Sequence, residues 1–164
     1  MTNFALLILK IVPFGRPKHD TIPSTVPPRL TFFSIDEFLV MKAIAGTMFV
    51  PSAPGEPTGD DLHIVERIDK LLSTSGTEVQ SQFRQLLTLF NTPLIAFLFD
   101  FRFSAFVNMA PSDQRAYLED WMTSSISFRR TVFQALKRIC MSVAYADPRT
   151  WKSVGYDGPL KAIP

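Results

Sequence analysis

Residues 34–51, Ser-Ile-Asp-Glu-Phe-Leu-Val-Met-Lys-Ala-Ile-Ala-Gly-Thr-Met-Phe-Val-Pro, carry the pattern that decides the fold of this chain. The first four form a capping box, in which the Ser34 hydroxyl and the Glu37 carboxylate each accept from a backbone N–H group that the first helical turn leaves unpaired. Apolar residues then recur at helical spacing, and Pro51 prevents continuation. The expected inward stripe is Ile35, Phe38, Leu39, Ile44, Ala45, Met48 and Phe49.

Helical signals continue through the rest of the chain. Further helices are predicted to begin near Asp60 or Asp61, at the capping box Thr77-Glu78-Val79-Gln80, after Asn91-Thr92-Pro93, at Pro111 and near Ser125. Their expected inward residues are Leu62, Val65, Ile68, Leu71 and Leu72; Val79, Phe83, Leu86, Leu87 and Phe90; Leu118 and Trp121; and Phe128, Val132, Leu136, Ile139, Cys140 and Val143. Arg129, Arg130, Lys137 and Arg138 are expected to face outward on the last helix.

The predicted helix over 94–106 is apolar on nearly every side, so it is either central in the bundle or covered by another chain, and burial within the chain is the simpler interpretation. No segment alternates with the period of a strand. The sequence therefore predicts an all-α fold: a single helical bundle domain of five or six helices over residues 32–164, with no internal repeat.

Residues 1–31 are expected to form an extended N-terminal arm, because five prolines stand among small and polar residues between 13 and 28. The apolar run at 4–14 is too short to cross a bilayer and lacks the charged start and cleavage site of a secretory signal. The single Arg-Arg pair, Arg129-Arg130, lies in the last predicted helix. We therefore expect no transmembrane segment, no export signal of the chain's own and, on sequence alone, a cytoplasmic location.

The composition is that of a folded domain. The chain has 164 residues, 46% hydrophobic and 20% charged, with a net charge of +2, which is too small to favour nucleic acid as a partner. Fifteen phenylalanines are unusual, and aromatic side chains are favoured in buried interface cores. This excess suggests that a partner protein covers part of the surface.

No catalytic or metal-binding motif stands out. Cys140 cannot alone hold a zinc ion or an iron–sulfur cluster, and we expect it to be a small buried apolar residue. His19 and His63 share no ligand spacing with a carboxylate, and no glycine-rich phosphate loop is present. The adjacent carboxylates fall at or near helix ends or on polar faces, which explains them without catalysis. These pairs are Asp36-Glu37, Asp60-Asp61 and Glu119-Asp120.

Residues 145–159, Tyr-Ala-Asp-Pro-Arg-Thr-Trp-Lys-Ser-Val-Gly-Tyr-Asp-Gly-Pro, predict a short structured tail after the last helix. Asp147-Pro148 is typical of an N-cap followed by proline at the first helical position. Gly155 is placed to end this short helix, and Gly158-Pro159 indicates a turn. A tail with so defined a shape is interpreted as a docking or closing element.

With these motifs in place, residues 32–159 resemble the gluconate 2-dehydrogenase subunit 3 family. The resemblance rests on Phe33 to Glu37, on Ala43 to Pro51, on Val65, Ile68 and Asp69, on the Phe83 helix, on Phe103-Ser104, on Phe133 to Arg138, and on Tyr145, Asp147-Pro148 and Trp151. Its most specific part is the ending Trp-x-x-x-Gly-Tyr-x-Gly-Pro at 151–159. The chain departs from the family's Ile-Ala-Asp-Thr-Ile-Ile-Pro pattern at Gly46, which stands where aspartate is usual.

The resemblance implies a non-catalytic accessory subunit with no cofactor of its own. Its partner would be a large flavoprotein dehydrogenase subunit of the glucose-methanol-choline type, which carries FAD and oxidises a sugar or another alcohol. A cytochrome or another electron-transfer subunit is a further candidate partner. Family members commonly carry a twin-arginine leader that exports the catalytic partner, so the resemblance also implies assistance in maturation or export and a periplasmic location.

The expected partner interface is Tyr145, Arg149, Trp151, Lys152, Tyr156 and Asp157. The three aromatic residues would be anchors and the two cations would lie at the rim. As an alternative, Trp151 and Tyr156 pack the tail onto its own bundle.

Two other classes of function fit the same helices. The chain could be a stand-alone helical adaptor or regulatory module, or a small enzyme with a site between helices. An enzyme would need polar groups that converge in an apolar pocket, and the candidates are Asp100, Arg102, Tyr117 and Tyr145.

Overall fold

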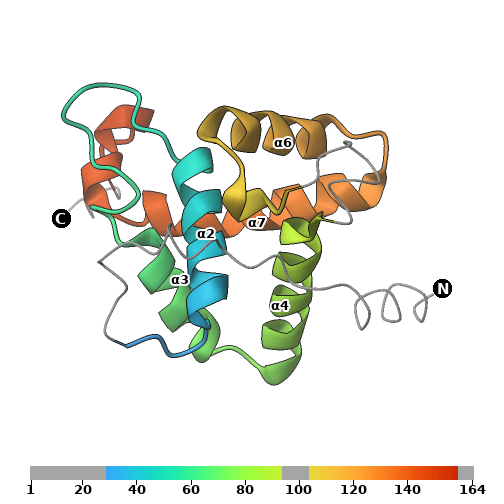
Figure 1. Cartoon of the computed structure of the whole chain (residues 1–164). Helices are drawn as coiled ribbons and strands as arrows, with labels where there is room; N and C mark the ends of the chain where they lie inside the picture. Colours follow the sequence, from blue (N-terminus) through green and yellow to red (C-terminus); the bar gives the residue numbers. More distant parts are fainter. Residues whose placement is uncertain (1–28, 94–103, 159–164) are drawn as a thin grey trace.

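A computed structural model describes residues 29–93 and 104–158. Within these ranges the regular structure is helical and no strand is present, which confirms the all-α class. In Figure 1, α2 stands in the middle of the domain, with α3 and α4 beside it and α7 passing behind. The helices are α2 (Ile35–Met48), α3 (Ile64–Ser73), α4 (Thr77–Asn91), α6 (Pro111–Thr123) and α7 (Ser127–Tyr145), with short 3-10 helices η2 (Phe106–Asn108), η3 (Pro148–Thr150) and η4 (Lys152–Val154).

α2 is the central helix because it is buried on most sides. Its predicted capping box is confirmed: the Ser34 hydroxyl accepts from the Glu37 N–H at 3.3 Å, and a Glu37 carboxylate oxygen accepts from the Ser34 N–H at 2.8 Å. The buried residues of α2 are Phe38, Leu39, Val40, Met41, Ile44 and Ala45. α2 therefore contacts every other long helix among the described residues, α3, α4, α6 and α7.

A buried carboxylate on α3 fixes the segment that leads into α2. Asp69 accepts four hydrogen bonds: from the Thr31 N–H (2.8 Å) and hydroxyl (2.6 Å), the Phe32 N–H (2.9 Å) and the Phe33 N–H (2.7 Å). Burial alone would raise the pKa of Asp69, but these hydrogen bonds together outweigh burial and hold the pKa below its usual value. Asp69 is therefore a structural anion, satisfied by three backbone N–H groups and one hydroxyl.

Groups from α4 complete this junction. The Phe83 ring meets the rings of Phe32 and Phe33 at 6.4 and 6.1 Å between centroids. Arg84 donates to the Phe32 carbonyl at 2.6 Å, places its guanidinium carbon 4.7 Å from the Phe32 ring centroid, and lies 3.8 Å from a Glu37 carboxylate oxygen. The start of α2 is thus held by both α3 and α4.

A second aromatic cluster joins α4, η2 and α6. The Phe90 ring centroid lies 4.9 Å from that of Phe106, 5.3 Å from that of Tyr117 and 4.8 Å from that of Trp121. Arg129 was predicted to face outward, and that prediction is wrong. The Arg129 side chain is buried, and its guanidinium carbon lies 5.1 Å from the Trp121 ring centroid. The aromatic face covers the cation, so helical periodicity alone assigns this arginine wrongly to solvent.

The second predicted capping box, at 77–80, is not formed. Gly76 is the N-cap of α4, and no side chain caps its first turn. The Gln80 side-chain amide instead donates to the carbonyls of Leu72, Ser73 and Ser75 at 2.9, 3.3 and 3.2 Å. Gln80 therefore donates to carbonyls at and just after the end of α3, a use that sequence spacing does not reveal.

The second helix also starts later than predicted, at Ile64, because residues 59–63 form turns. Four residues predicted to face inward are half-exposed: Ile35, Leu71, Val79 and Phe128. Each lies within three residues of a helix end. The predicted apolar helix at 94–106 lies almost wholly outside the described residues, as does the predicted arm.

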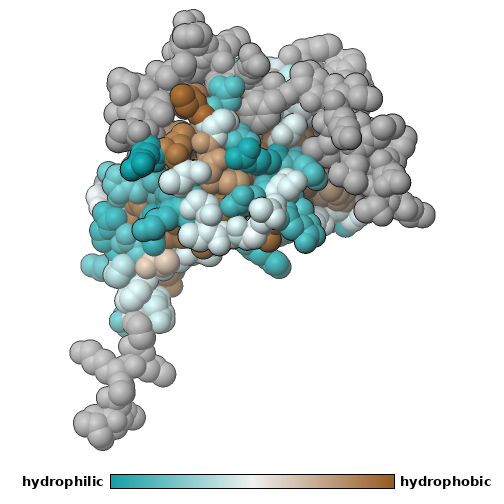
Figure 2. Space-filling view, turned by 90° about the horizontal axis from the view of Figure 1, so that it is seen from below, coloured by the Kyte–Doolittle hydropathy of each residue, from teal (hydrophilic) through white to brown (hydrophobic). Residues whose placement is uncertain are grey.

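The ends of the domain differ in their surfaces. The face seen from below is mainly hydrophilic or intermediate, with smaller hydrophobic areas (Figure 2). This end carries the start of α2 and the α3–α4 turn (Figure 1). At the opposite end of α2, the last turn is flanked by two cavities, one lined by Met48 and the other by Phe49.

Replacing Asp69 by asparagine is expected to destabilise the chain by about 3 kcal/mol, because an amide leaves buried N–H donors unsatisfied. The pKa of Asp69 is lowered on folding, so its contribution is present above the unfolded pKa of 3.8 and is lost as the pH falls below about 4. Urea unfolding followed by circular dichroism between pH 7 and pH 3 measures both effects. Glu119→Gln, an exposed carboxylate, is the control; equal stability of the two variants would contradict the assigned role.

Gly46→Ala is expected to stabilise the isolated chain by about 0.5–1 kcal/mol, because glycine inside an exposed helical turn costs that much relative to alanine. A Cβ atom built on Gly46 meets nothing within 4 Å. Thermal unfolding checks this expectation. Gly155→Ala provides a control of opposite sign, because Gly155 has φ +66° and a side chain there is strained.

Candidate partner interface

The tail after α7 is folded, as the sequence predicts. Asp147 caps η3 through a carboxylate oxygen that accepts from the Arg149 N–H at 3.1 Å, and Pro148 occupies the first helical position. η4 follows at once and ends at Gly155, whose left-handed conformation stops it. In Figure 1 the tail lies beside the loop that joins α2 to α3.

A cluster of charges attaches this tail to the bundle. Arg149 donates from Nε and Nη2 to the two carboxylate oxygens of Asp147, each at 2.9 Å, and Nη2 also reaches the Asp61 carbonyl at 3.2 Å. Arg67 on α3 lies 3.7 Å from the same carboxylate. The hydrogen bonds from Arg149 lower the pKa of Asp147 to about 2. Arg149 is therefore engaged in holding the tail, in addition to any role at an interface rim.

Trp151 also serves the packing of the tail. Its indole N–H donates to the Tyr145 carbonyl at 3.0 Å, and its ring meets the Tyr156 ring edge to face at 5.2 Å. Gly158, at φ +101°, lies so close that a Cβ atom there would be 3.0 Å from the indole ring. These contacts support the alternative interpretation, in which Trp151 packs the tail. The Trp151 side chain is half-buried.

Other aromatic and apolar residues of the tail are left to solvent. Tyr145 is 41% exposed and Tyr156 is 48% exposed, and Val154 between them is half-exposed. Lys152 and Asp157 are exposed as well. We name this set, with Trp151, the tail surface: Tyr145, Trp151, Lys152, Val154, Tyr156 and Asp157. Apart from Val154, these residues belong to the predicted interface, and their contact with a partner stays a prediction.

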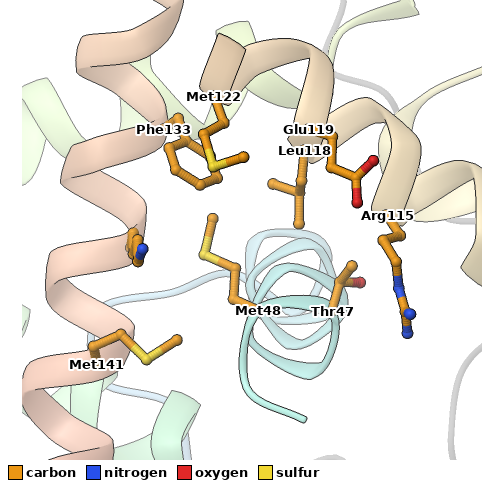
Figure 3. A pocket seen from close by; sticks show the side chains of 9 residues that line it. Thr47, Met48, Arg115, Leu118, Glu119, Met122, Phe133 and Met141 are labelled. Atoms are coloured by element: carbon orange, nitrogen blue, oxygen red, sulfur yellow. The ribbon is translucent and has the colours of Figure 1, made fainter.

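An apolar groove, which the sequence did not predict, opens near the end of α2. Its volume is 190 Å³, and three methionines from three different helices line it: Met48, Met122 and Met141. Leu118 and Phe133 form its buried floor. Figure 3 shows the three methionine side chains pointing toward one space. We name these five residues the methionine groove.

The groove and the tail surface adjoin. Phe49 directly follows Met48, and its ring lies 6.3 Å from the ring of Tyr145 in an edge-to-face arrangement. Met141 precedes Tyr145 by one turn of α7. Two further cavities, of 330 and 250 Å³, lie between α2 and the 50–60 loop and between α4 and α7.

The residues nominated for an enzyme are not gathered by the described part of the chain. Tyr117 is fully buried, and its hydroxyl donates to the Phe90 carbonyl at 3.2 Å, whereas Tyr145 lies on the tail surface. Asp100 and Arg102 lie outside the described residues. Burial raises the pKa of the Cys140 thiol to about 12, so Cys140 is an inert core residue.

Within residues 29–93 and 104–158, no three or more His, Cys, Asp or Glu side chains come together in a group that could hold a metal ion. No helix in those ranges has the length and apolar character needed to span a membrane.

These features define a small all-α domain with a folded, partly aromatic tail. A comparison with protein-family models then matches residues 35–158 to the family described as gluconate 2-dehydrogenase subunit 3. The chain belongs to this family, since the match covers most of its length. Searches of the curated proteins and of the solved structures found no match.

Asp147→Asn is expected to loosen the tail, because it removes the negative charge that pairs with Arg149 and Arg67, although an asparagine can still cap η3. The pKa of Asp147 is depressed on folding from 3.8 to about 2, so the native contribution is present above about pH 4 and is lost as the pH falls toward 2. Limited trypsin digestion at neutral pH should cut faster after Arg149 or Lys152 in this variant.

Asp157→Asn removes a tail carboxylate that is exposed, so it is the matched control for the digestion. Cleavage of Asp147→Asn at the wild-type rate would show that the charge cluster does not hold the tail.

Proposed function

We propose that this chain is a non-catalytic accessory subunit that binds and stabilises the catalytic subunit of a flavin-dependent sugar or alcohol dehydrogenase. The observation that carries the proposal is the family match over residues 35–158, since the family is described as a subunit of gluconate 2-dehydrogenase. The half-exposed aromatic residues of the tail surface support a role in binding another protein.

The proposed mechanism is stabilisation by association. A protein that binds only the folded form of its partner shifts the folding equilibrium of that partner toward the native state. An obligate contact between subunits buries about 2,000 Å² or more, of which a few aromatic anchors carry most of the energy. Under this proposal FAD belongs to the large partner subunit, which is of the glucose-methanol-choline type. A cytochrome or another carrier accepts the electrons.

Assistance in maturation or export belongs to the same proposal. A chain that associates with a folded flavoprotein can accompany it to another compartment, and a periplasmic location of the complex would follow from that escort. If the chain is instead a stand-alone helical adaptor, we expect it to be monodisperse when expressed alone and not to bind flavoproteins.

The test is co-expression of the full-length chain with the glucose-methanol-choline type flavoprotein encoded in the same genome. We expect a complex that survives size exclusion, shows flavin absorbance, and oxidises a sugar or alcohol in a dye-coupled assay. The flavoprotein expressed without this chain should be less soluble or should lose activity faster. A flavoprotein that is equally soluble, stable and active alone, and that never co-elutes with this chain, would rule the proposal out.

Tyr156→Ala is expected to weaken this assembly about 30-fold, or about 2 kcal/mol, as truncation of an aromatic anchor does. Tyr156 is preferred to Trp151 because Trp151 also holds the tail, so its removal would mix folding with binding. Affinity is measured by biolayer interferometry with the purified flavoprotein. Val79→Ala, which truncates a half-exposed residue at the other end of the domain, is the control, and equal affinities for the two variants would remove Tyr156 from the interface.

A further inference from the structure

The methionine groove is too small for a cofactor and too exposed to be a packing defect. Its 190 Å³ is below the range of about 300–1,000 Å³ typical of small-molecule sites. Met122 is 43% exposed on its edge, while Leu118 and Phe133 are buried beneath it. A cavity of this size accommodates one large apolar side chain of another polypeptide.

The side chains that line the groove are suited to receiving such an anchor. Met48, Met122 and Met141 belong to α2, α6 and α7, so three separate helices build one apolar surface (Figure 3). Methionine is unbranched and polarizable, and it adapts its shape to an inserted group at little cost. Their convergence from three packed helices gives a fixed location with an adjustable lining.

The rim of the groove is more basic than acidic. Arg115 on α6 and Lys137 on α7 flank it, and Glu119 is its one carboxylate, which gives a net charge of +1. Neither cation forms an ion pair with a carboxylate of residues 29–93 or 104–158. The sequence of α7 contains four cations and no acidic residue. A carboxylate on the incoming chain could therefore pair with two cations that no carboxylate of the described residues neutralises.

From this geometry we infer that the methionine groove is a second docking point for the catalytic subunit. The occupant is a segment of that subunit that carries a large apolar side chain next to an aspartate or glutamate. The inference rests on the proposed function. The groove adjoins the tail surface through the contact between Phe49 and Tyr145. The two surfaces are therefore adjacent and can be covered by one partner.

The test uses the full-length chain and the purified flavoprotein subunit, with affinity measured by biolayer interferometry. Lys137→Glu reverses a rim charge and is expected to weaken binding about tenfold. Arg138→Glu makes the same charge change at the next residue of α7, which is exposed but does not line the groove, and it is expected to change affinity less than threefold. The effect of Lys137→Glu should diminish at high salt.

Two further variants test the apolar part and the sign of the charge effect. Met122→Ala is expected to weaken binding about tenfold, with Leu71→Ala, a half-exposed residue of α3, as its control. Glu119→Gln removes the acidic charge from the rim and is expected to tighten binding about threefold. Thermal unfolding of each lone variant shows whether it is folded, and only folded variants are compared.

The outcomes separate this inference from the proposed function. If the wild-type chain binds no flavoprotein, the proposed function fails. If it binds, but Lys137→Glu and Arg138→Glu weaken binding equally, or Met122→Ala binds as tightly as wild type, the groove is not a docking point while the proposed function stands. If the groove variants alter self-association of the lone chain in ultracentrifugation and leave the affinity for the flavoprotein unchanged, the occupant is a second copy and the inference is wrong.

Discussion

The buried carboxylate of Asp69 is the constraint on which the rest of this structure depends. A buried charge is tolerated only when its hydrogen-bonding capacity is met, and here four donors from three consecutive residues, Thr31 to Phe33, meet it. The same contact places the rings of Phe32 and Phe33 against Phe83 of α4. One side chain of α3 therefore sets where the chain enters α2 and how α4 packs beside it.

Because α2 is fixed at its start, its last turn has a defined position at the other end of the domain. Thr47 and Met48 line the methionine groove, while Gly46 and Phe49 line the cavity toward the 50–60 loop. Recognition surfaces built on packed helices hold their geometry better than those built on loops. The tail is also held in place, since the ion pair between Asp147 and Arg67 attaches it to α3.

The sequence predicts the local features of this fold well and the long-range ones poorly. The Ser34 capping box, the Asp147-Pro148 start of η3 and the stop at Gly155 are set by neighbouring residues, so spacing reveals them. The Thr77 box has the same spacing but is replaced, because Gln80 serves the end of α3. The burial of Arg129 needs the ring of Trp121, which only packing brings near.

The predicted interface shows the same division between local and tertiary information. The spacing of Tyr145 and Tyr156 predicts that they share the tail, whereas the methionine groove requires three helices to meet and has no signature in any one of them. The two regions differ in stiffness as well as origin. The aromatic rings of the tail surface are rigid and sit on a segment held by ion pairs, whereas the unbranched methionine side chains of the groove can change conformation to fit a bound group. Under the proposed function, the tail surface would therefore set the orientation of the partner, and the groove would tolerate small differences in the segment that fills it.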